Sequence, residues 1–238
     1  MAKILDIKID NLNLGAAMTK IEHFLAGKKL CQIVTVNPEF IVFAQKDLEF
    51  KKILNQADLS IPDGFGLQIA ASILRQKIGE RLTGVDLTWE IAKLAAERGS
   101  RIFLLGGKPG IARKTAQRLK FIYPKLRIVG TYAGSPTERG LVEKINASKA
   151  EILLVAFGAP KQDKFIFKSR RQLKVKIAMG VGGTFDYIAG NVPRAPKWLR
   201  SLGLEWLYRL FIQPRRLGRI FRAVIVFPIL VIWRRLTD

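Results

Sequence analysis

The chain has 238 residues, which is enough for one large domain with a substantial core. Hydrophobic residues make up 49% and charged residues 25%, close to globular averages, which excludes a disordered, collagen-like or coiled-coil chain. The 41 Lys and Arg against 19 Asp and Glu give a net charge of +22, which predicts an anionic partner: nucleic acid, anionic lipid or a phosphorylated substrate.

Short apolar runs, mostly β-branched, alternate with amphipathic stretches along most of the chain. They predict strands, covered on both faces, at residues 4–9, 32–36, 101–105, 127–131, 151–157 and 175–179. The stretches at residues 109–121 and 136–148 predict helices between them. The alternation indicates an α/β fold with a mainly parallel, Rossmann-like sheet and helices on both faces, whose ligands bind beyond the carboxyl ends of the strands. The N-terminal residues contain no long apolar run, so we expect no signal peptide.

The composition changes near Arg194. Residues 194–238 contain ten Lys or Arg against two acidic residues, interleaved with seven aromatic residues. Within them, residues 223–233 form an apolar run of eleven, whereas a bilayer-spanning helix needs about 20. We therefore divide the chain into an α/β core at residues 1–193 and a C-terminal helical appendage at residues 194–238 that lies in a membrane interface. A helix docked on the core, with its arginines solvated, is the alternative.

Two glycine-rich loops follow predicted strands, at residues 103–110 and 180–186. Glycines let the backbone approach a phosphate, and a helix N-terminus offers free N–H groups. The candidate nucleotide contacts are Gly106, Gly107 and Pro109 in the first loop and Gly182, Gly183 and Asp186 in the second. A tight turn between strand and helix explains the first loop equally well, but two such loops at strand ends make a nucleotide-sized crevice more credible than either loop alone.

Polar side chains follow three other short strands. Asp63 comes after the strand that ends at Ile61-Pro62, and its carboxylate is a candidate general base, although Asp-Gly is also common turn chemistry. Thr35 and Asn37 end another strand; Asn37 either contacts a ligand or caps the helix after Pro38. Gln162 begins a helix after a strand and lies at the same rim of the sheet.

Nothing in the sequence suggests a metal site. The chain has one cysteine, Cys31, one histidine, His23, and no Asp-x-Asp pair of the kind that holds a cation on a sugar-nucleotide diphosphate. We therefore expect no metal cofactor. A leaving diphosphate would be neutralised by Arg, Lys and backbone N–H groups instead.

A series of ordered motifs gives the chain a specific resemblance. They are Thr35-x-Asn37, Pro62-Asp-Gly-x-Gly66, Glu80-Arg-x-Thr-Gly-x-Asp-Leu87, Phe103-Leu-Leu-Gly-Gly-x-Pro-Gly110, Gly158-x-Pro-Lys-Gln162, Gly180-Val-Gly-Gly-x-Phe-Asp186, Arg194-Ala-Pro-x-Trp198, Gly203-Leu-Glu-Trp-Leu-Tyr-Arg209 and Pro214-Arg-Arg216. Over residues 4–222 the chain resembles the WecG/TagA/CpsF glycosyltransferases, which make enterobacterial common antigen, wall teichoic acid linkage units and capsular polysaccharides. The resemblance implies an inverting, metal-independent transfer from a UDP-sugar to a polyprenyl-diphosphate-linked sugar, by a cytoplasmic protein peripheral on the inner membrane face.

The resemblance also assigns site residues. Asp63 matches the proposed catalytic base. The matching substrate-binding residues are Thr35, Asn37, Gln162, Arg209, Arg216 and Arg219. Asp163 and Phe165 depart from the family pattern, which commonly has Glu and Trp there. N-acetylmannosamine, its uronic acid and glucose all remain open as the donor sugar, and so does the oligomeric state.

Two other classes compete with an enzyme. The basic, aromatic C-terminal segment suggests a nucleic-acid-binding protein, but its long apolar run suits lipid better, so we expect no nucleic acid partner. A non-catalytic membrane scaffold is the second. For the enzyme, truncation after Arg222 is expected to weaken membrane binding and leave turnover on a water-soluble acceptor largely intact.

Overall fold

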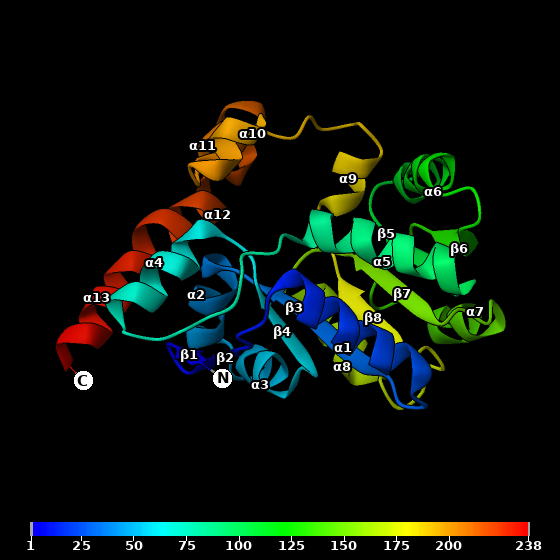
Figure 1. The fold of residues 1–238 in the computed structure, drawn as a ribbon, viewed down its shortest axis with the longest axis horizontal. Coiled ribbons are helices and arrows are strands. Elements are labelled where there is room, and N and C mark those ends of the chain that lie inside the picture. Colours follow the sequence, from blue (N-terminus) through cyan, green and yellow to red (C-terminus); the bar gives the residue numbers. More distant parts are fainter. Residues whose placement is uncertain (1, 238) are drawn as a thin grey trace.

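The computed structural model describes residues 2–237. A six-stranded, entirely parallel sheet has the strand order β4-β3-β8-β7-β5-β6 (Figure 1). The strands are β3 (Cys31–Val36), β4 (Leu59–Pro62), β5 (Arg101–Gly106), β6 (Arg127–Tyr132), β7 (Ile152–Ala156) and β8 (Ile177–Gly180). The expected parallel sheet is confirmed, and all six strands end at the same edge.

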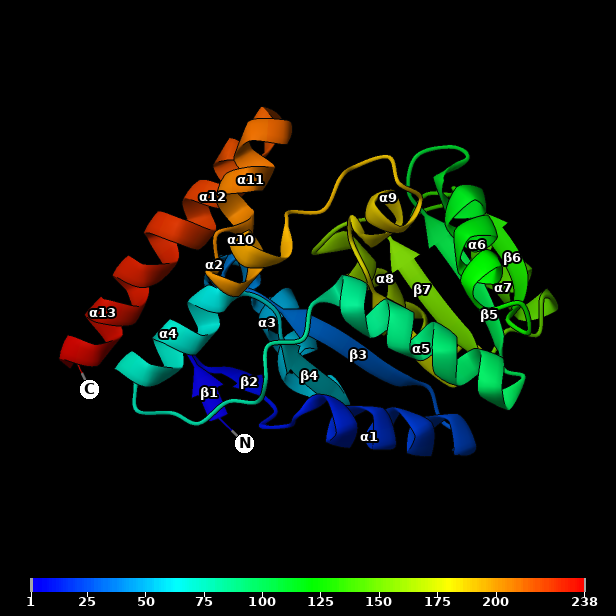
Figure 2. The same cartoon turned by 45° about the horizontal axis from the view of Figure 1, so that its top comes forward.

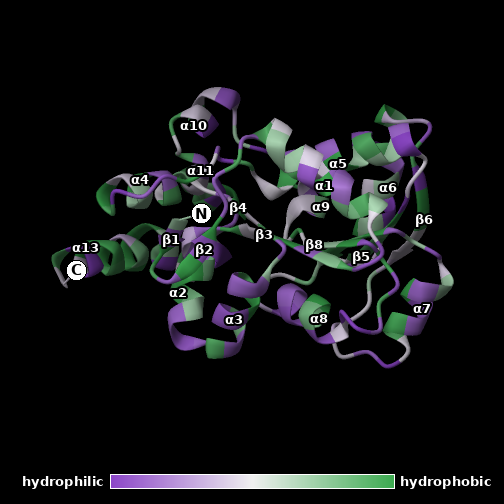
Figure 3. Ribbon diagram, turned by 60° about the horizontal axis from the view of Figure 1, so that its bottom comes forward, coloured by the Kyte–Doolittle hydropathy of each residue, from purple (hydrophilic) through white to green (hydrophobic). Residues whose placement is uncertain are grey.

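Helices cover both faces of this sheet, as expected (Figure 3). One face carries α1 (Leu14–Ala26), α5 (Gly84–Arg98) and α6 (Ile111–Ile122), and the other carries α3 (Leu48–Gln56), α7 (Leu141–Ala147) and α8 (Lys161–Ser169). The helices expected at 109–121 and 136–148 begin later. Gly110 and Gly140 have φ values of 82° and 75° immediately before α6 and α7, so neither belongs to its helix.

Two of the predicted strands were partly wrong. Residues 4–9 form a hairpin of β1 (Ala2–Ile4) and β2 (Ile7–Ile9), a separate two-stranded antiparallel sheet. Leu5 and Asp6 both have positive φ and make its two-residue turn, a conformation the run of apolar residues did not signal. β6, at one edge of the sheet, is half-exposed rather than covered on both faces, whereas β4 at the other edge is fully buried.

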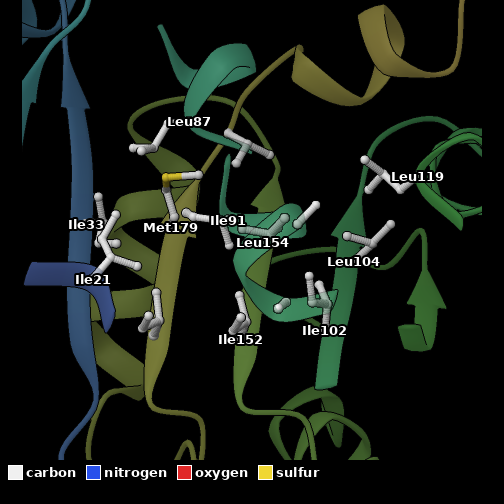
Figure 4. Packing of buried hydrophobic residues seen from close by; sticks show 14 of the residues in the cluster. Ile21, Ile33, Leu87, Ile91, Ile102, Leu104, Leu119, Ile152, Leu154 and Met179 are labelled. Carbon is white, nitrogen blue, oxygen red and sulfur yellow. The ribbon is translucent and has the colours of Figure 1, made fainter. Parts of the chain in front are cut away.

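The largest buried cluster lies between the sheet and α1, α5 and α6 (Figure 4). Ile152 and Leu154 are two residues apart on β7, so both side chains point to this face of the sheet. They pack with Met179 of β8 and Ile91 of α5. These side chains are buried, so the central strands form a rigid platform for the loops at their carboxyl ends.

The C-terminal part is helical, as expected, and lies at one end of the molecule beyond an extended stretch (Figure 2). It comprises α10 (Lys197–Ser201), α11 (Glu205–Ile212), a 3-10 turn (Pro214–Arg216), α12 (Leu217–Phe221), a π-helical turn (Arg222–Val226) and α13 (Phe227–Thr237). Of the residues described, none belongs to a helix both long and apolar enough to cross a bilayer.

One face of α13 packs on the core. Phe227 and Val231 are 1% exposed and join a buried cluster with α2 (Pro38–Lys46) and α4 (Phe65–Ile73). α13 lies beside α4 in both views of the ribbon (Figures 1 and 2). The docked helix, the alternative reading of this segment, is therefore present. Truncation after Arg222 would remove these two core side chains, so it should also lower the stability of the fold, and the turnover of the truncated enzyme stays a prediction.

Candidate functional site

The site lies where β3 and β4 end side by side. Asp63 directly follows β4, and its backbone N–H donates to the carbonyl of Val36 at 2.6 Å. Thr35 is the penultimate residue of β3, and Asn37 follows that strand. Asn37 accepts a hydrogen bond from Phe40 N–H at 3.0 Å and caps α2, so the capping interpretation is confirmed. Asn37 also lines the cavity described below.

The Asp63 carboxylate is suited to accept a proton. Burial raises the pKa of Asp63 to about 6, against the opposing influence of the Arg209 charge and of a hydrogen bond from Gly84 N–H. That hydrogen bond is 3.3 Å long and comes from the first residue of α5. A carboxyl group with this pKa is ionised at neutral pH and is a stronger base than an ordinary aspartate.

Two arginines from the appendage, Arg209 and Arg216, line the same cavities as Asp63. Arg209 of α11 pairs with Glu205 at 2.6 Å, and its guanidinium lies 5.0 Å from the centre of the Tyr187 ring. Burial and the neighbouring charges of Arg219 and Arg209 lower the pKa of Arg216. The guanidinium of Arg216 forms no hydrogen bond or ion pair within residues 2–237, and it lies against Gly183. Clustered cations of this kind favour binding of a polyanion.

Arg219 is held by a carboxylate that the sequence analysis missed. Both carboxylate oxygens of Glu39 accept from Arg219 Nε at 2.9 Å, and Arg222 Nη2 lies 3.3 Å from Glu39 Oε1. Glu39 is in the first turn of α2 and is 6% exposed. From sequence it looks like an ordinary acidic residue at a helix N-terminus. In the fold it fixes the appendage to the core and orients Arg219.

A second ion pair fixes the start of the appendage. Both carboxylate oxygens of Asp86, in α5, accept hydrogen bonds from the guanidinium of Arg194, at 2.6 and 2.8 Å. Arg194 also donates to the hydroxyl of Thr83, which caps α5. The two motifs that contain Asp86 and Arg194 therefore join the core to the appendage.

Asp63 and the three arginines line two adjoining cavities. The larger, about 340 Å³, is lined by Asn37 and these charged groups and also by apolar side chains of α4 and the appendage. The smaller, about 80 Å³, is lined also by Thr35, Gln162, Gly182 and Gly183. The structure thus brings nine predicted site residues together: Thr35, Asn37, Asp63, Gln162, Gly182, Gly183, Arg209, Arg216 and Arg219.

Gln162 joins two of the loops. It is 1% exposed, and its Oε1 accepts from Gly158 N–H at 3.1 Å and from Gly182 N–H at 3.0 Å. A Cβ on Gly180 would come within 2.5 Å of its amide nitrogen, so glycine is required there. Gln162 therefore shapes the cavity, and its contact with substrate stays a prediction.

The next residue, Asp163, is also buried, and burial raises its pKa to about 7.

Four predicted nucleotide contacts do not line these cavities: Gly106, Gly107, Pro109 and Asp186. The glycine loop follows β5, and β7 and β8 lie between β5 and the β3–β4 pair, so the loop is displaced along the sheet edge. Gly107 N–H donates to the Ala156 carbonyl at 3.1 Å. Asp186 lies in α9 (Thr184–Ile188), between the cavity residues Thr184 and Tyr187. Their nucleotide contacts stay predictions.

Among residues 2–237 there is no group of three or more His, Cys, Asp or Glu placed to hold a metal ion. Both cavities are lined by the buried Asp63 carboxylate and by the guanidinium groups of Arg209, Arg216 and Arg219. Such a combination can remove a proton from a hydroxyl group and neutralise phosphate oxygens.

Comparisons with known proteins identify the family of this chain. The sequence model of the Glycosyl transferase WecG/TagA/CpsF family matches residues 2–238. The chain is 34% identical over 211 residues to the N-acetylglucosaminyldiphosphoundecaprenol N-acetyl-beta-D-mannosaminyltransferase of Bacillus subtilis. The aligned region covers 88% of this chain and 82% of that protein. The enzyme of the same name from Bacillus spizizenii is 34% identical over 197 residues, 82% of this chain and 77% of that protein. The chain therefore belongs to the WecG/TagA/CpsF family and is a glycosyltransferase.

Proposed function

We propose that this enzyme transfers N-acetylmannosamine from its UDP-linked form to an N-acetylglucosamine carried by a polyprenyl diphosphate, in synthesis of a cell-surface polymer such as teichoic acid. The single observation that carries the proposal is the cavity in which Asp63, with a pKa raised to about 6, faces Arg209, Arg216 and Arg219. The names of the two Bacillus relatives support the choice of donor sugar and acceptor.

The reaction we propose is a single displacement with inversion. The acceptor hydroxyl attacks the anomeric carbon of the donor sugar, its proton passes to the Asp63 carboxylate, and the bond from that carbon to the UDP oxygen breaks. Negative charge then develops on the departing diphosphate. Arg216 is the residue best placed to neutralise it, because its guanidinium has no carboxylate partner among the residues described. Arg209 and Arg219, each already paired with a glutamate, add to the positive potential of the cavity.

A donor screen tests this function. The purified enzyme is offered UDP-N-acetylmannosamine, its uronic acid and UDP-glucose, with a short-chain polyprenyl-diphosphate N-acetylglucosamine as the acceptor, in excess EDTA. We expect transfer from UDP-N-acetylmannosamine, inversion at its anomeric carbon, and no loss of rate in EDTA. Preference for another donor would correct the sugar. A rate that requires added Mg²⁺ or Mn²⁺ would show that arginines alone do not neutralise the leaving group.

We propose further that the enzyme works at the cytoplasmic face of the membrane, on which its appendage lies. Five apolar side chains recur along α12, the π-helical turn and α13 at spacings of three or four residues, and each is 45–80% exposed. This apolar stripe consists of Phe221, Ile225, Ile229, Ile232 and Leu236. Such a stripe on a basic segment suits the interface of an anionic membrane.

Vesicle binding tests the apolar stripe. Replacement of Ile229 and Ile232 together by Asp should weaken binding to phosphatidylglycerol-containing vesicles by about tenfold or more, because two exposed apolar side chains no longer enter the interface. Leu48→Asp is the control, since Leu48 is 79% exposed on α3, outside the appendage. Equal binding by wild type and both variants in a sedimentation assay would place the membrane contact elsewhere.

A further inference from the structure

The larger cavity changes character along its length. Asp63 and the guanidinium groups of Arg209, Arg216 and Arg219 also line the smaller cavity, so they lie at the end of the larger cavity that adjoins it. The residues that line only the larger cavity include the charged Glu39, Arg81 and Glu205, but most of the others are apolar. Six of these apolar residues belong to α4 or to residues 220–228, and we call them the apolar groove: Phe65, Ile69, Ile220, Ala223, Val224 and Pro228.

The two walls of the apolar groove come from distant parts of the chain. Phe65 and Ile69 are four residues apart and lie on one face of α4. Ile220, Val224 and Pro228 recur every four residues and form the facing wall on the appendage. α4 and α13 lie side by side in Figures 1 and 2, which agrees with their contacts. The groove therefore exists only because the appendage docks on the core.

The apolar groove opens toward the apolar stripe. Each stripe residue at 221, 225 and 229 follows a groove residue at 220, 224 and 228, which places the two rows about 100° apart around the helix. On the other wall, Phe65 and Ile69 line the groove and are still 43% and 49% exposed. Hydrophobic residues also dominate the ribbon of α13 in Figure 3. An apolar path thus runs from the arginines to the surface that would face lipid.

We propose that the apolar groove binds the first isoprene units of the acceptor lipid, next to its diphosphate. The proposal rests on the proposed function, which supplies a lipid-linked acceptor. The lining supplies one group for each part of such a molecule: the Asp63 carboxylate for the sugar hydroxyl, the Arg219 guanidinium for the acceptor diphosphate, and the hydrocarbon walls for the chain. Arg219 directly precedes the groove residue Ile220, and Arg216 is left to the donor diphosphate. The remaining isoprene units then leave the groove beside the apolar stripe and continue into the bilayer.

Binding of two small diphosphates tests the groove without requiring turnover. Calorimetry compares geranyl diphosphate, which has ten carbons, with methyl diphosphate, in buffer without detergent or vesicles. For the wild-type enzyme we expect geranyl diphosphate to bind at least about tenfold more tightly, because its chain leaves water for an apolar groove. Equal affinities for the two compounds would overturn the proposal.

Substitutions locate the binding. Ala223→Phe fills the groove and should bring the affinity ratio of the two diphosphates close to one. Ile225→Phe, two residues away on the exposed stripe, adds an aromatic ring outside the groove and should keep the wild-type ratio. Ile69→Ser should also lower the ratio; Ile69 is half-exposed, so this variant stays informative if Ala223→Phe fails to fold. A wild-type ratio in folded Ala223→Phe or in Ile69→Ser would also overturn the proposal.

The same binding experiment separates the two proposals. The enzyme could bind geranyl diphosphate tightly, lose this binding in Ala223→Phe, and yet transfer no sugar to any lipid-linked acceptor. This result would support the proposed groove and reject the proposed function. Sugar transfer by an enzyme that binds methyl and geranyl diphosphate equally well would retain the function and reject the groove.

Discussion

Replacement of Asp63 by Asn is expected to lower kcat by about two orders of magnitude or more while the affinity for UDP changes only a few-fold. The two side chains have nearly the same shape, so the variant loses only the ability to accept a proton. Because burial raises the pKa of Asp63 to about 6, wild-type kcat/KM should fall as the pH drops through about 6, where the carboxylate becomes protonated. The residual activity of Asp63→Asn should lack this acidic limb.

Stability measurements distinguish this loss from damage to the fold. The folded state keeps a proton on Asp63 up to about pH 6, whereas an unfolded aspartate loses it near 4. Asp63 therefore makes the protein less stable as the pH rises between these values, by on the order of 3 kcal/mol in total. Asp63→Asn should remove this pH dependence and stay folded at pH 7.5. Asp6→Asn, a change in the turn of the β1–β2 hairpin that lines neither cavity, should keep wild-type turnover. Near-normal turnover in Asp63→Asn would remove Asp63 from the mechanism.

Phe227→Ala is expected to lower the free energy of unfolding by about 3–5 kcal/mol, because it opens a cavity where a fully buried ring packs between α13, α2 and α4. Trp233→Ala is the matched control. It removes an aromatic side chain from the same helix, but Trp233 is 62% exposed and its loss should cost about 0.5 kcal/mol or less.

Urea denaturation of the two variants measures this difference directly. If Phe227→Ala costs no more than Trp233→Ala, α13 does not dock on the core in solution. The apolar groove would then lose one of its walls. The core at residues 1–193 would fold without packing against α13, as the change in composition near Arg194 suggested. A large cost for Phe227→Ala instead makes α13 part of the folded domain.

The α/β class and most of the site could be predicted from the sequence. Short β-branched runs between amphipathic stretches specify a parallel sheet, because strands buried on both faces need continuous apolar residues. Parallel strands end at one edge, so Asp63 and Asn37 were expected at the same rim, where the structure places them. The family resemblance added Arg209, Arg216 and Arg219, which composition alone would leave among many surface arginines.

Other features depended on local geometry or on the strand order. The hairpin turn at Leu5 and Asp6 requires two positive φ values that apolar periodicity does not encode. The order β4-β3-β8-β7-β5-β6 brings the loop at Gly182 to Asp63 and keeps the loop at Gly106 away, although both loops are glycine-rich. Sequence motifs mark loops that follow strands, but they do not state which strands are neighbours.

The docking of the appendage was decided only by the tertiary structure. Arg219 meets Glu39 across 180 residues of chain, and neither residue carries a local signal for the other. The apolar run at residues 223–233 is equally compatible with a lipid surface and with a protein core, because both offer an apolar environment. The fold gives α13 one buried face at Phe227 and Val231 and leaves Ile229 and Ile232 exposed. Local sequence patterns determine how apolar residues recur along each helix or strand. What each face of that helix or strand contacts depends on which distant segments pack together.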